Sequence, residues 1–241
     1  FTRNFSNTRN TNNDNEIYQP FFKYFEGKQI APHRDDVGVD SNSIHLSFLL
    51  DRSGSMCSFN TEKIIDSIKG FITDQMAGKT DHKFTITIFS FDDKCRVVFD
   101  EEIKSVDDVQ INVDDISPRD STALLEANAF AIEYVGRKCS HWGTTIGDSR
   151  PGTIVFATMT DGEENSSSGE WNGSEGREKL SKIVKEHTDK WGWKFFFLAA
   201  NIDSQATGSV MGYNVDQCID FHTSNEGYDN AFQSCSRAVH E

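Results

Sequence analysis

The sequence is short of basic residues, and this limits the partners that it can bind. It has 24 lysines and arginines against 38 aspartates and glutamates, which gives a formal net charge of −14 at pH 7. Nucleic-acid backbones and anionic membrane surfaces are bound by basic patches. We therefore expect no nucleic-acid partner, and the charge favours cations or basic protein surfaces as partners.

Long hydrophobic runs are also missing. No apolar stretch approaches the ~20 residues that a membrane-spanning helix needs, so we expect no membrane insertion in this segment. With 4 prolines but 19 phenylalanines, the 241 residues suit one large folded domain. Because the chain begins at Phe1 rather than at methionine, we expect it to be a processed or excised piece.

The cysteines lack the spacing of a metal site. The sequence contains no C-x-x-C and no H-x-x-x-H, so a structural zinc site has little support. We predict that no cysteine is bridged, which favours a reducing compartment, with Cys218–Cys235 as the pair that would form if one did. Three N-x-S sequons leave a cell-surface or secreted origin open. The cysteines are Cys57, Cys95, Cys139, Cys218 and Cys235, and the sequons begin at Asn4, Asn165 and Asn172.

Regular hydrophobic patterns begin only after residue 42. The stretch up to about Tyr18 is rich in Asn, Thr and Ser, and no clear element follows it before residue 43. We therefore expect a flexible polar lead-in and irregular segment over residues 1–42, and one folded domain over 43–241.

Within that domain, apolar runs alternate with stretches of helical periodicity. Residues 95–103 follow the run at 84–91 after a tight polar turn, so these two strands should form an antiparallel hairpin. We predict strands at 44–50, 84–91, 95–103, 153–160, 194–201 and about 217–221, and helices at 59–78, 121–138, 175–192 and from about Tyr228. This order predicts an α/β fold: a doubly wound, Rossmann-like, mostly parallel six-stranded sheet with one antiparallel edge strand and helices on both faces.

Ligands of doubly wound sheets bind at the carboxyl ends of the strands. Oxygen-bearing side chains gather at three such places in this sequence. They are Asp51, Ser53 and Ser55 after the first strand, Thr122 before a helix, and Asp161 after the strand at 153–160.

Four kinds of site could use these residues. A phosphate loop is excluded, because the segment "DRSGSMCSFN" lacks the required lysine and glycines. A serine nucleophile would need the G-x-S-x-G elbow, and an aspartate nucleophile would need a second acid where this chain has Ser53. Capping of the next helix by Ser55 or Asn60 explains one oxygen but not the others.

A divalent cation explains all of these oxygens. Mg²⁺ prefers about six oxygen ligands in octahedral array, and short side chains on alternate residues of a tight loop can converge on one point. Two carboxylates and three neutral hydroxyls would leave the ion electrophilic. An open coordination position would then attract an acidic side chain from a partner.

At these residues the sequence resembles a von Willebrand factor type A domain and its metal-ion-dependent adhesion site. The family's signature is D-x-S-x-S, a distant Thr and a distant Asp, and "DRSGS", "STALLEA" and "TDGEENS" match it in order. The segments "SPRDSTALLEA" and "FFFLAANID" are most similar to those of compact bacterial and phage members of the family. The resemblance covers about residues 43–241.

The resemblance implies a role for each site residue. Ser53 and Ser55 would bind the ion directly. Thr122 would do so in the ligand-engaged state, and Asp51 and Asp161 would act directly or through water. The implied ion is Mg²⁺, with Mn²⁺ or Ca²⁺ as alternatives.

The rim of the site contains further candidates. Asp120 stands where related loops often have glycine, so it alters the loop or adds a third negative charge near the ion. Glu163 and Glu164 belong to an acidic loop that is either solvated or selects a basic partner surface. Trp142 and Trp171 lie in loops, where aromatic residues can anchor an interface.

These observations predict a domain that binds a protein, or alternatively a glycan, through a cation that captures an acidic group. The resemblance implies a role in a larger assembly, either adhesion or scaffolding with an ATPase or chelatase. The three site segments contain no histidine or lysine that could transfer a proton, so we expect no catalysis. The alternative is a metal-dependent hydrolase that acts on phosphate esters at the same site.

Overall fold

A computed structural model of the protein describes residues 38–141 and 149–240. Its sheet has the strand order β3-β2-β1-β4-β5-β6, and the neighbours are parallel except for β2 and β3. The predicted sheet, including its antiparallel edge strand, is therefore confirmed. The strands are β1 (Gly38–Asp51), β2 (Lys83–Phe91), β3 (Cys95–Ile103), β4 (Ser149–Thr160), β5 (Lys194–Ala199) and β6 (Cys218–Asp220).

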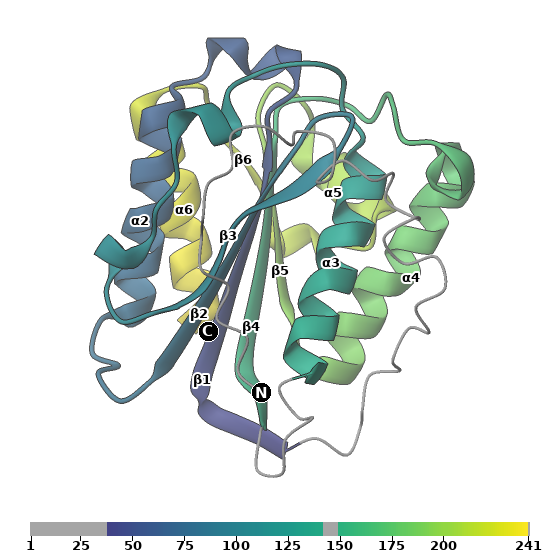
Figure 1. The fold of residues 1–241 in the computed structure, drawn as a ribbon. Coiled ribbons are helices and arrows are strands. Elements are labelled where there is room, and N and C mark those ends of the chain that lie inside the picture. Colours follow the sequence, from purple (N-terminus) through teal and green to yellow (C-terminus); the bar gives the residue numbers. More distant parts are fainter. Residues whose placement is uncertain (1–37, 142–148, 241) are drawn as a thin grey trace, which may run out of the picture.

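Helices cover both faces of this sheet, as predicted. Figure 1 shows α2 and α6 on one side and α3, α4 and α5 on the other. The α-helices are α2 (Thr61–Met76), α3 (Leu124–His141), α4 (Gly173–Trp191), α5 (Ser204–Val210) and α6 (Asn225–His240). The 3₁₀ helices are η1 (Gly54–Ser58), η2 (Val106–Asp108), η3 (Val113–Ile116), η4 (Gly169–Trp171) and η5 (Val215–Gln217).

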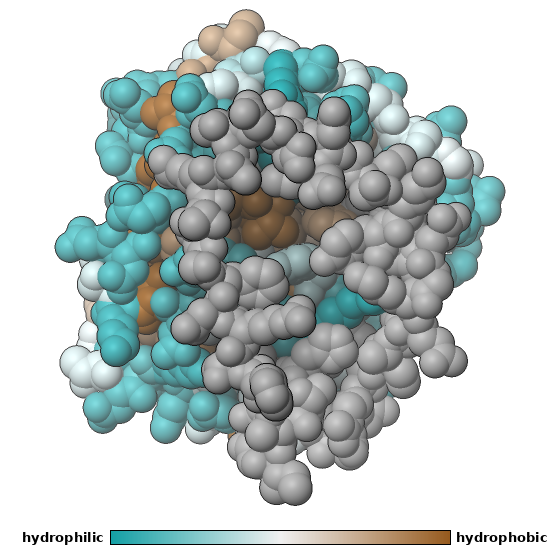
Figure 2. All heavy atoms as spheres, in the orientation of Figure 1, coloured by the Kyte–Doolittle hydropathy of each residue, from teal (hydrophilic) through white to brown (hydrophobic). Residues whose placement is uncertain are grey.

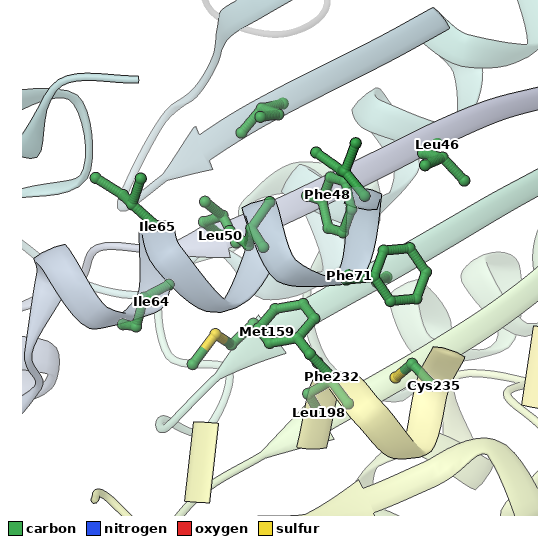
Figure 3. Packing of buried hydrophobic residues seen from close by; sticks show 14 of the residues in the cluster. Leu46, Phe48, Leu50, Ile64, Ile65, Phe71, Met159, Leu198, Phe232 and Cys235 are labelled. Atoms are coloured by element: carbon green, nitrogen blue, oxygen red, sulfur yellow. The ribbon is translucent and has the colours of Figure 1, made fainter. Parts of the chain in front are cut away.

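The core has two halves, one on each face of the sheet. Successive residues of β1 point to opposite faces, so Phe48 and Leu50 join the cluster under α2 and α6, whereas Leu49 joins the cluster under α3 and α4. Figure 3 shows Phe48 beside Phe71 of α2 and Phe232 of α6. Burial on both faces explains why the central strands are continuous apolar runs in the sequence.

The surface has the opposite character. In the view of Figure 2, hydrophilic residues predominate over the described part of the molecule, with hydrophobic atoms in smaller areas between them. Within the described residues, none of the helices is both long and apolar enough to cross a membrane.

The first and fourth strands are longer than predicted. β1 begins at Gly38, upstream of the predicted domain start at residue 43, and β4 begins at Ser149 rather than at residue 153. The two extensions pair with each other, with Gly38 opposite Ser149 and Asp40 opposite Pro151. Their side chains are mostly outside the core, so hydrophobic periodicity could not reveal them. α5 was not predicted either, because its sequence SQATGSV has little apolar character.

The cysteines lie in separate places. All five are free, and the predicted alternative pair is divided by the sheet, since Cys218 belongs to the cluster under α3 and α4 and Cys235 to the one under α2 and α6. We expect thiol titration under denaturing, non-reducing conditions to count five free groups. A pre-reduced sample is the control, and a count of three would show that one disulfide exists.

A buried histidine adds a polar element to β1. His45 is fully buried, its Nδ1 lies 2.8 Å from Thr85 Oγ1, and its Nε2 lies 3.4 Å from Thr87 Oγ1. Burial, assisted by the positive charge of Lys138, holds the pKa of His45 well below its usual value of 6.5. The folded protein therefore keeps this imidazole neutral, whereas the unfolded chain can protonate it.

This difference should make His45 a source of acid instability. Protons bind preferentially to the unfolded state, so the contribution of His45 to the free energy of unfolding is fully present above pH 6.5. Below pH 6.5 it falls by up to about 1.4 kcal/mol per pH unit, until the folded imidazole also binds a proton. We expect urea unfolding at successive pH values to show this slope as the difference between the wild type and His45→Gln. Parallel stability curves for the two proteins would contradict the expectation.

Candidate metal centre

The predicted site residues lie at the carboxyl ends of the strands, in the middle of the sheet, where the order of the strands reverses. β1 and β4 are parallel neighbours that end at Asp51 and Thr160, and Leu50 is paired with Met159 just before both ends. This places Asp51 close to Asp161, the residue that follows β4. From β1 the chain continues to β2 and β3 on one side of the sheet, and from β4 it continues to β5 and β6 on the other side. The carboxyl ends of β1 and β4 therefore flank the switch point where such sheets bind ligands.

The acids and serines of the site are joined by hydrogen bonds. The Ser53 amide donates to Asp51 Oδ1 at 2.7 Å, and the Thr160 hydroxyl donates to Asp51 Oδ2. Ser55 Oγ donates to Asp161 Oδ1 at 2.6 Å and lies 3.1 Å from Ser53 Oγ. The loop after β1 is therefore fixed by its own aspartate and by the end of β4.

Gly162 shows that the three hydroxyl groups converge. A Cβ atom added to Gly162 would lie 3.4 Å from both Ser55 Oγ and Thr122 Oγ1, and 3.9 Å from Ser53 Oγ. Two loops that are distant in sequence thus bring three hydroxyl oxygens around one small space beside Gly162 on a third loop. The absence of a side chain at Gly162 keeps this space open, and the residue types fit a hard divalent cation.

The two carboxylates are held in an environment that disfavours their charge. Asp51 is 3% exposed, and burial raises its pKa to about 6, against the hydrogen bonds from Thr160 and Ser53 and with a smaller contribution from the charge of Asp161. Burial also raises the pKa of Asp161. A cation at this place would relieve the cost of both charges.

Thr122 is positioned by the loop that follows Asp161. Its amide donates to Asn165 Oδ1 at 2.9 Å, and its carbonyl accepts from the amides of Asn165 and Ser166. Glu164 Oε2 accepts from the Leu125 amide at 2.8 Å, where it caps the first turn of α3. The role of Asn165 was missed in the sequence, because no local pattern indicates a contact across 43 residues.

The predicted rim residues differ in exposure and in their contacts. Glu163 is exposed, whereas Glu164 is occupied with capping α3, so the acidic loop is held beside the site through Glu164. Trp171 is 7% exposed and packs in the core cluster with α4, so its assignment to the rim was wrong. Trp142 lies outside the described residues.

Asp120 adopts the backbone conformation for which related loops use glycine. Its φ is 56°, in the left-handed region. Its carbonyl accepts from the Gly54 amide at 3.0 Å, and its exposed carboxylate lies 3.8 Å from Arg119 Nε. The loop is therefore kept despite the aspartate, and Arg119 offsets part of the added negative charge.

A second acidic group lies beside the predicted site. Carboxylate oxygens of Asp92, Asp93 and Asp120 lie within 4.8 Å of one another. Asp92 is the buried member, and its carboxylate accepts hydrogen bonds from Arg52 and Arg119. The group is therefore an ion-paired cluster that borders the site; of its members, Asp92 and Asp93 were not predicted from the sequence.

Comparison with known proteins yields matches in structure alone. No family model matches the sequence, and no curated protein does. The chain is similar to a von Willebrand factor type A protein from Catenulispora acidiphila (TM-score 0.52, 11% identity, 83% of this chain and 43% of that one). It is also similar to the pilus adhesin SpaC from Lactobacillus rhamnosus GG (TM-score 0.57, 12% identity, 84% and 31%).

A third similar structure is the conserved hypothetical protein BatB from Bacteroides thetaiotaomicron (TM-score 0.51, 14% identity). The match covers 82% of this chain and 100% of BatB, whereas this chain spans less than half of the other two structures. At these identities the likeness concerns the fold, and it agrees with the resemblance seen in the sequence motifs. The described part of the chain has the von Willebrand factor type A fold.

Proposed function

We propose that the domain binds a protein partner through a divalent cation, Mg²⁺ or alternatively Mn²⁺ or Ca²⁺, at the carboxyl edge of its sheet. The cation would be held directly or through water, and it would accept an acidic side chain of the partner. The residues that would hold it are Asp51, Ser53, Ser55, Thr122 and Asp161.

The observation that carries this proposal is the convergence of three hydroxyl oxygens beside Gly162. Helix capping or loop stability would each need one such oxygen, but neither needs hydroxyls from two separate loops at one point. Two carboxylates with raised pKa values adjoin the same space. Oxygen ligands, partial burial and excess negative charge together are what a hard cation requires.

The protein's own residues would have separate roles at the centre. Asp51 is tied through both carboxylate oxygens, so it would orient the loop and supply charge. Ser53 and Ser55 would supply neutral ligands, which leave the positive charge of the ion incompletely balanced. A bound cation would supply an electrophilic position for an external carboxylate.

The similar structures support a binding role rather than catalysis. SpaC is named as a pilus adhesin, and two further similar structures are of a matrix protein of the mussel byssus. We therefore propose a non-catalytic role in adhesion or scaffolding. A pull-down with immobilised domain, with and without EDTA, would identify partners that depend on the cation.

Replacing Gly162 with alanine should separate cation binding from folding. The new methyl group would lie at ordinary contact distance from the hydroxyls, so the metal-free fold should tolerate it, but it would fill the space that they surround. We expect calorimetric titration with Mn²⁺ to show affinity lower by about tenfold or more, equivalent to about 1.4 kcal/mol. The midpoint of urea unfolding in EDTA should change little.

Gly70→Ala is the matched control for this variant. Gly70 is exposed on α2, and an added Cβ would meet no atom within 4 Å. This change should leave Mn²⁺ affinity unaltered. Equal affinities for the wild type and Gly162→Ala would argue against a cation between the three hydroxyls.

A further inference from the structure

We infer that Asp92 is a positioning residue that sets the distance between the loop bearing Ser53 and Ser55 and the loop bearing Thr122. The inference concerns the same centre and rests on the proposed function. Asp92 follows the last residue of β2, the strand next to β1, and it is 1% exposed. It is not among the predicted ligands.

The carboxylate of Asp92 is fully engaged. Its Oδ2 accepts from Arg52 Nε and from Arg119 Nε, each at 2.7 Å. Its Oδ1 accepts from the Lys94 amide at 2.9 Å, which closes the turn between β2 and β3. One rigid turn therefore holds two guanidinium groups through a single oxygen atom.

These two arginines belong to the two loops of the metal centre. Arg52 lies between Asp51 and Ser53, and its side chain is 3% exposed. Arg119 lies upstream of Thr122, on the other loop. Charge-assisted hydrogen bonds to one shared carboxylate thus fix each loop to the same point of the sheet.

Backbone hydrogen bonds also connect these two loops and the end of β2. The Arg119 amide donates to the Arg52 carbonyl at 2.7 Å, and the Gly54 amide donates to the Asp120 carbonyl at 3.0 Å. The Ala123 amide donates to the Asp92 carbonyl at 2.8 Å. The two loops are therefore held in register by backbone hydrogen bonds as well as by the carboxylate that their arginines share.

Removal of the Asp92 charge should reverse the force between the loops. Arg52 and Arg119 would then be two neighbouring cations without their shared anion. The buried Arg52, whose side chain is 3% exposed, would bear most of this cost, because the side chain of Arg119 is 43% exposed and partly screened by water. The loops would separate, and Thr122 would move away from Ser53 and Ser55.

Because both carboxylate oxygens of Asp92 are engaged, the neighbouring Asp93 and Asp120 do not make this cluster a second cation site.

The test compares Asp92→Asn with Asp100→Asn. Asp100 on β3 is a matched control, because its carboxylate accepts from Thr87 Oγ1, Tyr134 OH and Lys138 Nζ, away from the centre. Both variants lose one charge from a polar network. Only Asp92→Asn should raise the Kd for Mn²⁺, by tenfold or more.

A second readout needs no metal. In EDTA, amide hydrogen exchange at Gly54, Arg119 and Ala123 should accelerate by tenfold or more in Asp92→Asn, relative to amides of β5. Asp100→Asn should leave these three amides unchanged relative to β5. If Asp92→Asn does not fold, Arg119→Gln should accelerate exchange at Gly54 and Ala123 in the same way.

The two readouts separate the possible failures. Unchanged exchange at the three amides in Asp92→Asn would overturn the inference whether or not the protein binds Mn²⁺. Accelerated exchange with an unchanged Kd would also overturn it, because the loop spacing would then not matter for the ion. If the wild type itself binds no Mn²⁺, the proposed function fails, and accelerated exchange would support the loop-spacing part of the inference alone.

Discussion

Replacing Asp51 with asparagine should abolish cation binding and at the same time stabilise the metal-free domain at pH 7. We expect Mn²⁺ affinity to fall by about 100-fold or more, equivalent to about 2.7 kcal/mol, because the variant loses a buried charge at the centre. The metal-free domain should instead gain stability, since the same charge is costly when no cation balances it.

The sign of the stability change follows from the pKa of Asp51. Its value is about 6 in the folded protein, raised mainly by burial from an ordinary value of 3.8. The folded state therefore binds a proton more tightly than the unfolded state, and stability is lost as the pH rises from 3.8 to about 6. Above that range the ionised carboxylate costs about 3 kcal/mol, which asparagine does not incur.

Asparagine should also keep the local hydrogen bonds. Its amide oxygen can accept from the Ser53 amide, and its NH₂ group can donate to the Thr160 hydroxyl, which rotates to accept. Urea unfolding in EDTA and calorimetric titration with Mn²⁺ measure the two effects. Asp74→Asn, which removes an exposed acid from α2, should change neither. Loss of stability together with loss of binding would mean that Asp51 is mainly a structural residue.

Truncating Phe48 should cause the largest loss of folding free energy among these variants. Phe48 is 1% exposed on β1, and its ring centroid lies 5.6 Å from that of Phe71 and 6.2 Å from that of Phe232. Both neighbours come from helices on the same face, as Figure 3 shows. Phe48→Ala would leave a cavity between strand and helices, at a cost of about 3–5 kcal/mol.

Urea unfolding measures this cost directly. Phe48→Leu is the control, because it retains most of the apolar volume and should cost about 1.5 kcal/mol or less. A similar loss in both variants would mean that the ring contacts, rather than the cavity, determine the stability of this part of the core.

The sequence predicted the fold because its main signals are local. β2 and β5 are short apolar runs buried on both faces, and the alternation of strands and helices determines a doubly wound sheet. The paired extensions at Gly38 and Ser149 escaped prediction because each is polar and is held by backbone pairing with the other. Side-chain periodicity carries no information about such pairs.

The same distinction applies to the candidate site. Asp51, Ser53 and Ser55 could be found because they occupy alternate positions in one turn and match a known motif. Asp92 and Asn165 could not, because each acts on residues of other loops, 27 to 43 positions away, and resembles any polar loop residue in the sequence. The prediction for Trp171 was wrong because its position in a loop does not reveal that its ring packs in the core.

The central position of β1 has a mechanical consequence. Its carboxyl end bears Asp51, and its amino end at Gly38 lies at the opposite pole of the sheet (Figure 1). Tension between a captured ligand and the chain before Gly38 would run along the strand axis. Because β2 and β4 flank β1 in parallel over most of its length, such a pull would shear both ladders of hydrogen bonds at once rather than unzip them singly. The strand that presents the candidate centre is thus held on each side by a ladder that such a pull would load in shear.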